Sequence, residues 1–246
     1  TLWNNAQLNA PSTYREGMAA ASSNQQSNNG TGRHLDQDIA QQMVDKAIQA
    51  GATYSEVRLV SNQNTSISMR DGQVRNAISG LDVGATLRCL VNGSWGVHST
   101  TDLQALTSQV EATVNLASSV AQRRAKEDSA VELAEIPIST KDVHWRAKKD
   151  IRDISMQEKV EVLEEFDSFI RTDERIVSVN TGFTDEHIEM ELTTSEGMDR
   201  AWSFQRTCTN AIVTGRESGE VASYRTRVGG VGGFEAVEAV DLQQVG

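Results

Sequence analysis

The feature that most constrains this chain is an Asp-Gly pair, Asp71-Gly72, set between two runs of strand-like sequence. In the run before it, NTSISMR, apolar and polar residues alternate, which is typical of a β-strand with one buried face. An Asp-Gly pair favours a two-residue type I′ turn, because both central residues of that turn need a positive φ. The turn pairs Arg70 with Gln73. The buried face that it predicts consists of Thr65, Met69, Val74 and Ile78.

A second turn signal, Asn92-Gly93, ends the next strand-like run. A two-residue turn at this place would put Trp95 on the face opposite to Val91, although both are large apolar residues. A loop that also includes Ser94 pairs Val91 with Trp95 and keeps them on one face. We therefore predict a three-residue loop in the second hairpin.

Three helices are predicted around these strands, because apolar residues recur every three or four positions in each segment. Ser155 and Glu158 have the spacing of a capping box at the start of the third. The later sequence returns to alternating strands, such as EHIEMELTT. We predict an α+β fold, in which a helix-flanked antiparallel sheet is followed by a second, strand-rich antiparallel region. The predicted helices cover residues 36–50, 102–124 and 155–171.

Composition divides the chain into three parts. The first residues are polar and almost without large apolar side chains, so we expect them to be disordered and to add little stability. A charged connection that contains Pro137 follows the second predicted helix, and we place a domain boundary there. The predicted parts are a polar lead at 1–34, an N-terminal α/β domain at 35–135, and a strand-rich middle domain at 136–246 that is truncated at its C-terminal end.

The formal net charge of −11 argues against nucleic-acid binding, which needs a basic surface to displace counterions from phosphates. No apolar run approaches the ~20 residues that cross a bilayer. The N-terminal residues lack the pattern of a signal peptide, so we expect a cytoplasmic protein without membrane contact. The two cysteines, Cys89 and Cys208, lie far apart in strand-like runs, and we interpret both as reduced thiols.

No self-contained catalytic or metal site is recognisable in the sequence. No two histidines have the spacing that places two imidazoles on one helix face for a metal. Alternation places His187, Glu189 and Glu191 on one strand face, which we interpret as solvated. We therefore predict no catalytic residue and no metal ligand in this chain, and the substrate-binding residues stay unknown. The histidines are His34, His98, His144 and His187.

Several short motifs, in order, resemble one known family. They are AIQAGATYSEVRL, ISMRDGQVRNAISGLDVGATLRCLVNGSWGVHSTTDL, ELTTSEG and RVGGVGGFE. Each piece alone is weak, but their joint order and separation are specific. From about residue 36 to the end, the chain resembles the TldD/PmbA proteins, a family of zinc metallopeptidases also called modulators of DNA gyrase.

The resemblance implies a protein whose catalytic residues lie further along the chain. TldD-type members carry a His-Glu-x-x-x-His helix and a further Cys ligand in a C-terminal region, and no residue here matches that motif. PmbA-type members can lack it. We therefore expect the full-length protein to be a zinc metallopeptidase, and we expect this chain alone to bind no zinc tightly and to be inactive.

The function implied is that of the N-terminal part of a metallopeptidase acting on unfolded or small peptides, forming its scaffold and substrate cleft. The alternative is a non-catalytic, PmbA-like partner subunit or an interaction protein. The implied partners are a peptide substrate and a second subunit, in a homodimer or a heterodimer with a paralogous chain. A weaker third reading is an acidic protein that touches a topoisomerase by mimicking the charge of DNA.

Overall fold

The computed structural model describes residues 37–124 and 130–238. The predicted polar lead at 1–34 therefore lies outside the described residues. The helices are α2 (Gln37–Gln49), α3 (Leu103–Arg123), α4 (Met156–Ile170) and the single turn α5 (Glu235–Glu238). The strands are β1 (Tyr54–Arg70), β2 (Gln73–Val91), β3 (Ser94–Thr100), β4 (Val143–His144), β5 (Ile176–Thr194), β6 (Asp199–Glu217) and β7 (Glu220–Val231).

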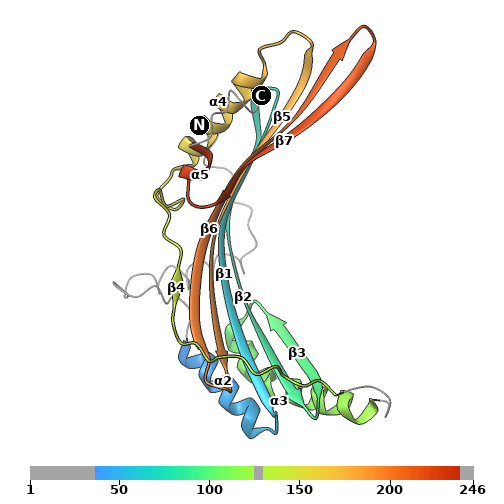
Figure 1. The fold of residues 1–246 in the computed structure, drawn as a ribbon, viewed down its shortest axis with the longest axis vertical. Coiled ribbons are helices and arrows are strands. Elements are labelled where there is room, and N and C mark those ends of the chain that lie inside the picture. The colour runs from blue at the N-terminus through green and yellow to red at the C-terminus, as the bar shows by residue number, and fades with distance from the viewer. Residues whose placement is uncertain (1–36, 125–129, 239–246) are drawn as a thin grey trace. The chain divides into compact units, whose positions relative to one another are not determined.

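One seven-stranded sheet organises the described chain, in the order β3-β2-β1-β5-β6, with both β7 and the short β4 paired to β6. All pairs are antiparallel except β4 with β6. Figure 1 shows the long strands curving along their length, with α2 and α3 near one end and α4 and α5 near the other. The fold is α+β, as predicted. Pairing of β1 with β5 unites strands of both predicted domains in one sheet, and the boundary at 135/136 stays a prediction.

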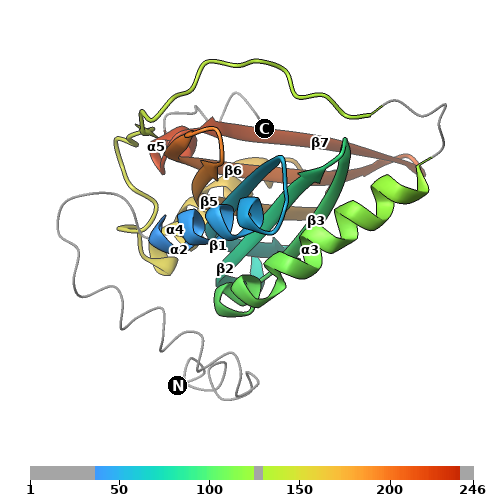
Figure 2. The ribbon, with the colours of Figure 1, turned by 90° about the horizontal axis from the view of Figure 1, so that it is seen from below.

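The first hydrophobic core lies where α2 and α3 cover one end of the sheet, as Figure 2 shows from below. It is built from small and aliphatic side chains of α2, α3, β1 and β2. Gly96 lets α3 approach β3 closely, because a Cβ at this position would lie 2.2 Å from the carbonyl oxygen of Thr113. The core residues include Met43, Val44, Val57, Leu59, Leu87, Leu106, Val110 and Ala117.

The second core lies under α4 and α5 at the other end of the sheet and is richer in aromatic residues. Helix α4 begins with the predicted capping box: Ser155 Oγ accepts from the Glu158 N–H at 3.2 Å, and Glu158 Oε2 accepts from the Ser155 N–H at 2.8 Å. The buried residues of the second core include Ile67, Met69, Leu163, Phe166, Ile170, Val179, Phe183 and Phe234.

The first hairpin confirms the predicted turn but not the whole predicted register. Asp71 and Gly72 have φ values of 53° and 73°, and Met69 pairs with Val74. A β-bulge then shifts the register, so that Ser68 pairs with Asn76. The prediction that Thr65 shares its face with Ile78 is wrong for this reason, because Thr65 pairs with Ser79 instead. Of the predicted buried face, Val74 and Ile78 are exposed.

The predicted three-residue loop in the second hairpin is wrong. Val91 pairs with Ser94, which leaves a two-residue turn of Asn92 (φ 47°) and Gly93 (φ 72°). Trp95 therefore lies on the face opposite to α3. There its ring packs on the guanidinium of Arg88, 4.1 Å from the ring centroid, and edge-on against Tyr54. An indole can stay half-buried in such a cluster, so its size did not determine the register.

Candidate functional site

A layer of polar side chains lies on the helix-bearing face of the sheet, between the two cores. Residues two apart on one strand share a face, and Leu59, Thr65 and Ile67 of β1 show the order of first core, polar layer and second core. Thr65 pairs with Asp185 on β5, and Asp185 pairs with Thr207 on β6. The polar layer therefore crosses the three central strands.

The centre of this layer is a buried ion pair. Lys159 reaches down from α4, and its Nζ lies 2.7 Å from Asp185 Oδ2, with side-chain exposures of 7% and 2%. The same Nζ donates to Thr65 Oγ1 at 3.2 Å. Burial raises the pKa of Asp185, while Lys159 acts to lower it. The contacts tie α4 to both β1 and β5.

His187 continues the layer toward the first core. Its Nδ1 lies 3.3 Å from Gln205 Nε2, and its Nε2 lies 3.2 Å from Glu189 Oε1. Gln205 also accepts a hydrogen bond from the backbone N–H of Ile151 at 3.1 Å. The alternation predicted for His187, Glu189 and Glu191 is confirmed. The prediction of a solvated face is wrong, because His187 and Glu191 are buried and the segment around Ile151 packs over Gln205.

The other sequence-predicted histidines do not join this layer. His98 is half-buried on β3, opposite Leu87. His144 is exposed on β4, with its Nδ1 2.9 Å from Ser203 Oγ. His34 lies outside the described residues. Each described histidine therefore has its own separate surroundings.

Both cysteines are free thiols, as predicted. Cys89 is buried in the first core, 3.8 Å from Ser55 Oγ, and burial raises the pKa of its thiol. Cys208 is half-buried on the opposite face of the sheet, where it accepts from Arg227 Nε at 2.8 Å.

Across residues 37–124 and 130–238, no group of three or more His, Cys, Asp or Glu side chains is arranged to hold a metal ion. In the polar layer a lysine balances the central carboxylate, and the Thr65 hydroxyl is buried beside this pair. Its arrangement suits a structural joint between the helices and the strands. The absence of catalytic and metal residues in the whole chain stays a prediction.

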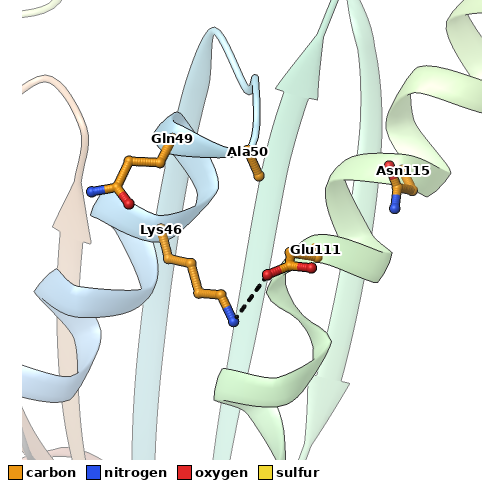
Figure 3. Close-up of a pocket in the computed structure, with 5 residues that line it drawn as sticks. All are labelled: Lys46, Gln49, Ala50, Glu111 and Asn115. Carbon is orange, nitrogen blue, oxygen red and sulfur yellow. Dashed lines mark ion pairs between the residues drawn. The ribbon is translucent and has the colours of Figure 1, made fainter.

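A shallow hollow of about 380 Å³ lies between α2 and α3 (Figure 3). Lys46 of α2 and Glu111 of α3 face each other across it, with Nζ and Oε1 3.4 Å apart. Opposite charges that are already paired leave little to attract a charged ligand, and the exposed pair adds little stability. The hollow is lined by Lys46, Gln49, Ala50, Glu111 and Asn115.

Free strand edges are the other binding feature of the sheet. Strand β7 pairs with β6 along one edge, and its second edge has no partner among the described strands. Strand β3 covers only residues 85–91 of β2, which leaves 73–84 with an open edge as well. Open edges present unpaired N–H and C=O groups to which an extended peptide can add as a further strand.

Two models of one protein family match this chain. The first, described as PmbA/TldA metallopeptidase domain 1, matches residues 55–121, which cover most of β1 to α3. The second, described as PmbA/TldA metallopeptidase central domain, matches residues 149–246 and includes α4 to α5. The charged connection between α3 and α4 lies mostly between the two matches.

Relatives with known names are metalloproteases. A metalloprotease of Synechocystis is 27% identical over 158 residues, which cover 63% of this chain and 33% of that relative. A metalloprotease of Methanothermobacter thermautotrophicus is 24% identical over 195 residues, covering 78% of this chain and 41% of the relative. This chain thus spans less than half the length of either one.

Solved structures share the fold. A protein of Bacteroides thetaiotaomicron described as a modulator of DNA gyrase superposes with a TM-score of 0.67 at 22% identity, over 85% of this chain and 48% of that one. TldE of Thermococcus kodakarensis superposes with a TM-score of 0.59 at 12% identity, over 84% of this chain and 46% of that one. No described helix is long and apolar enough to span a membrane. With both domain models matched in order, the chain belongs to the PmbA/TldD family of metallopeptidases.

Proposed function

We propose that this chain is the scaffold and substrate-binding part of a zinc metallopeptidase that acts on unfolded or small peptides. The observation that carries the proposal is the match to both the first and the central metallopeptidase domains of one family. The open edges of β2 and β7 support it, since an extended peptide can bind there through its backbone, largely independent of sequence.

The family's description implies a metal cofactor, but the described residues do not fit one. The central carboxylate of the polar layer, that of Asp185, is paired with Lys159. Zinc needs three or four His, Cys, Asp or Glu ligands within ~2.3 Å. We assign the zinc ligands of the full-length protein to residues outside those described here.

Experiments on the 246-residue chain test whether it binds peptides while the zinc ligands lie elsewhere in the full-length protein. Its zinc content after purification and its cleavage of an unstructured peptide are measured beside its binding of the same labelled peptide. We expect peptide binding without stoichiometric zinc and without cleavage. Cleavage that a chelator abolishes would place a metal site within these residues and overturn the proposal.

The alternative is a non-catalytic partner subunit, cytoplasmic and paired with a catalytic paralogue. The chain shares its fold with TldE of Thermococcus kodakarensis as well, and this fold suits either function. Zinc content and peptidase activity of the full-length protein separate the two functions. Stoichiometric zinc with chelator-sensitive cleavage supports the peptidase. If the full-length protein contains no zinc but binds a paralogue that does, the partner subunit is supported.

A further inference from the structure

The connection between α3 and β4 crosses the sheet and is anchored at both of its ends. At one end, the Val131 N–H donates to the Gly93 carbonyl oxygen at 2.9 Å, in the turn between β2 and β3. At the other, Asp142 Oδ1 accepts from the Ala201 N–H on β6 at 2.9 Å. We call residues 132–141, between these anchors, the strap. In Figure 1 it passes in front of the strands, and in Figure 2 it arches clear of them on the side away from α2 and α3.

The strap leaves apolar side chains in water. No residue of the strap has a hydrogen bond or an ion pair with another described residue. Leu133, Ile136 and Ile138 are 38%, 59% and 60% exposed. A single exposed apolar residue is ordinary in a folded protein. Several of them close together on a segment without hydrogen bonds indicate a surface that can still be buried.

The face of the sheet that the strap crosses is also apolar. Val60 follows the core residue Leu59 on β1 and therefore points away from the helices. Met190 lies opposite Val60, and Trp202 lies opposite Met190, so the three form a row across β1, β5 and β6. Leu192, two residues after Met190, shares this face. The side chains of the row are half-buried. All four described helices pack on the other face, where both cores lie.

The strap is long enough to lie on this face without moving either anchor. From Val131 to Asp142 the chain can span ~36 Å, whereas the strands from β3 to β6 lie within ~20 Å. Ile138 is four residues before Asp142 and can reach ~13 Å from it. Leu192 lies opposite Arg200, only one strand away from β6. Ile138 can therefore reach Leu192.

The charges of the strap and of this face are complementary. Glu135 lies in the strap, and Arg58 lies opposite Leu192 on β1. Both side chains are exposed, and neither forms an ion pair with another described residue. A strap that lies on the face brings these opposite charges together at the place where the apolar side chains meet.

We infer that the strap closes over the helix-free face of the sheet, burying Ile138 against Leu192 and Trp202 and pairing Glu135 with Arg58. Burial of apolar surface drives the closure, and the entropy lost when the strap becomes ordered opposes it. The two anchors reduce that cost, because they already hold the ends of the strap at the sheet. The closed strap covers the apolar row and keeps it from other proteins. This device does not depend on the proposed peptide binding.

Disulfide trapping in the 246-residue chain tests the closure. The variant Ile138→Cys, Leu192→Cys is made with Cys208→Ser, which removes the half-buried native thiol and leaves Cys89, which is buried. The matched control pairs Ile138→Cys with Ile78→Cys, because Ile78 is exposed on the same face but lies opposite Ser66, ~26 Å along β1 from Arg58. A disulfide needs Cα atoms within ~7 Å. With oxidised glutathione we expect an intramolecular bond to form at least about tenfold faster at Leu192→Cys than in the control.

Peptide mass spectrometry identifies the bond, and circular dichroism checks that each variant keeps the fold. Equal rates for the two cysteine pairs would overturn the closure. Disulfides between two chains, increasing with protein concentration, would make a second copy the occupant of this face and also overturn it.

The charge pairing is tested in the same cysteine variant. Glu135→Lys should slow the trapping about two- to fivefold at low salt, as expected for an exposed ion pair. Adding Arg58→Glu to Glu135→Lys should restore the rate, whereas Glu161→Lys on the outside of α4 should leave it unchanged. If Arg58→Glu does not restore the rate, the assigned pairing is wrong.

Discussion

The two ends of the sheet are stabilised in different ways, although the same strands pass through both. At the α2–α3 end, the core consists of small and aliphatic residues that lie between Ala40 and Ala117. At the α4–α5 end, the core brings together Ile67, Phe166 and Phe234 from three distant parts of the chain. The first core therefore draws on residues 40–117, whereas the second draws on residues spread from 67 to 237.

The two cores meet across the polar layer of Lys159 and Asp185 rather than merging. A buried ion pair stabilises little relative to well-packed apolar residues, but removing one partner costs much. The layer thus fixes how α4 sits on β1 and β5 without extending either core. Variants in each region can show how far the two ends depend on each other.

The largest effect is expected at the joint, where Lys159→Met leaves Asp185 buried without its partner. We expect a loss of about 3–5 kcal/mol in the free energy of unfolding, measured by urea denaturation. The double variant Lys159→Met, Asp185→Leu should recover most of it, and Lys141→Met on the exposed connection should cost little. A loss below about 1 kcal/mol for the single variant would contradict the importance given to the joint.

The α2–α3 end is tested by Gly96→Ala. Its new Cβ would overlap the Thr113 carbonyl, so α3 must shift, at a cost of about 1–3 kcal/mol. Gly84→Ala, on the neighbouring strand, meets the Thr100 carbonyl oxygen at an ordinary 3.7 Å and serves as the matched control. Hydrogen exchange should show the loss of protection in α2 and α3 before α4. Equal protection loss at both ends would show that the two cores unfold as one.

At the α4–α5 end, Gly72→Val strains the tip of the first hairpin, where φ is 73°. A β-branched residue in this conformation costs about 1–3 kcal/mol. Gln73→Val, which has no such requirement, should cost less, and thermal unfolding of both variants measures the difference. The type I′ turn would lose its role if the two variants were equally stable.

The smallest effect is expected at Asp150, beside the joint. Its carboxylate accepts from Arg152 at 2.7 Å, and this pairing lowers the pKa of Asp150. Because the folded pKa is lowered, the stabilisation is present above the ordinary carboxyl pKa and is lost as the pH falls through the folded value. Asp150→Asn should therefore cost under about 1 kcal/mol at neutral pH and progressively less in acid. If Asp150→Asn lowered the free energy of unfolding more in acid than at neutral pH, the direction assigned to the pKa shift of Asp150 would be wrong.

Local patterns predicted the parts of the fold that local chemistry determines. The Asp71-Gly72 turn and the Ser155 capping box depend on neighbouring residues, and both are present. Register beyond the turn was less accessible, because the bulge at the first hairpin depends on how β2 meets β1 over a longer distance. The loop length predicted for the second hairpin was wrong because it assumed that Trp95 belongs to the core, whereas its ring packs on Arg88 outside the core.

The polar layer left only partial signals in the sequence. Lys159 lies four residues before Leu163 on the apolar stripe of α4, so its burial could have been inferred. Asp185 lies two residues after the buried Phe183, which places both side chains on the same face of β5. That the two side chains meet depends on the docking of α4 against β1 and β5, which no local pattern encodes.

The pairing of β1 with β5 also sets the order in which the molecule can assemble. The β1–β2 hairpin closes a two-residue turn and can form within ~10 μs, whereas Glu56 must find Thr194 far along the chain. Closing that long loop is slow, because its entropy must be lost before the new contacts stabilise it. During synthesis, β1 therefore waits with one edge open until α4 and β5 have left the ribosome. We expect the newly made N-terminal half to be the species most prone to aggregation and most dependent on chaperones.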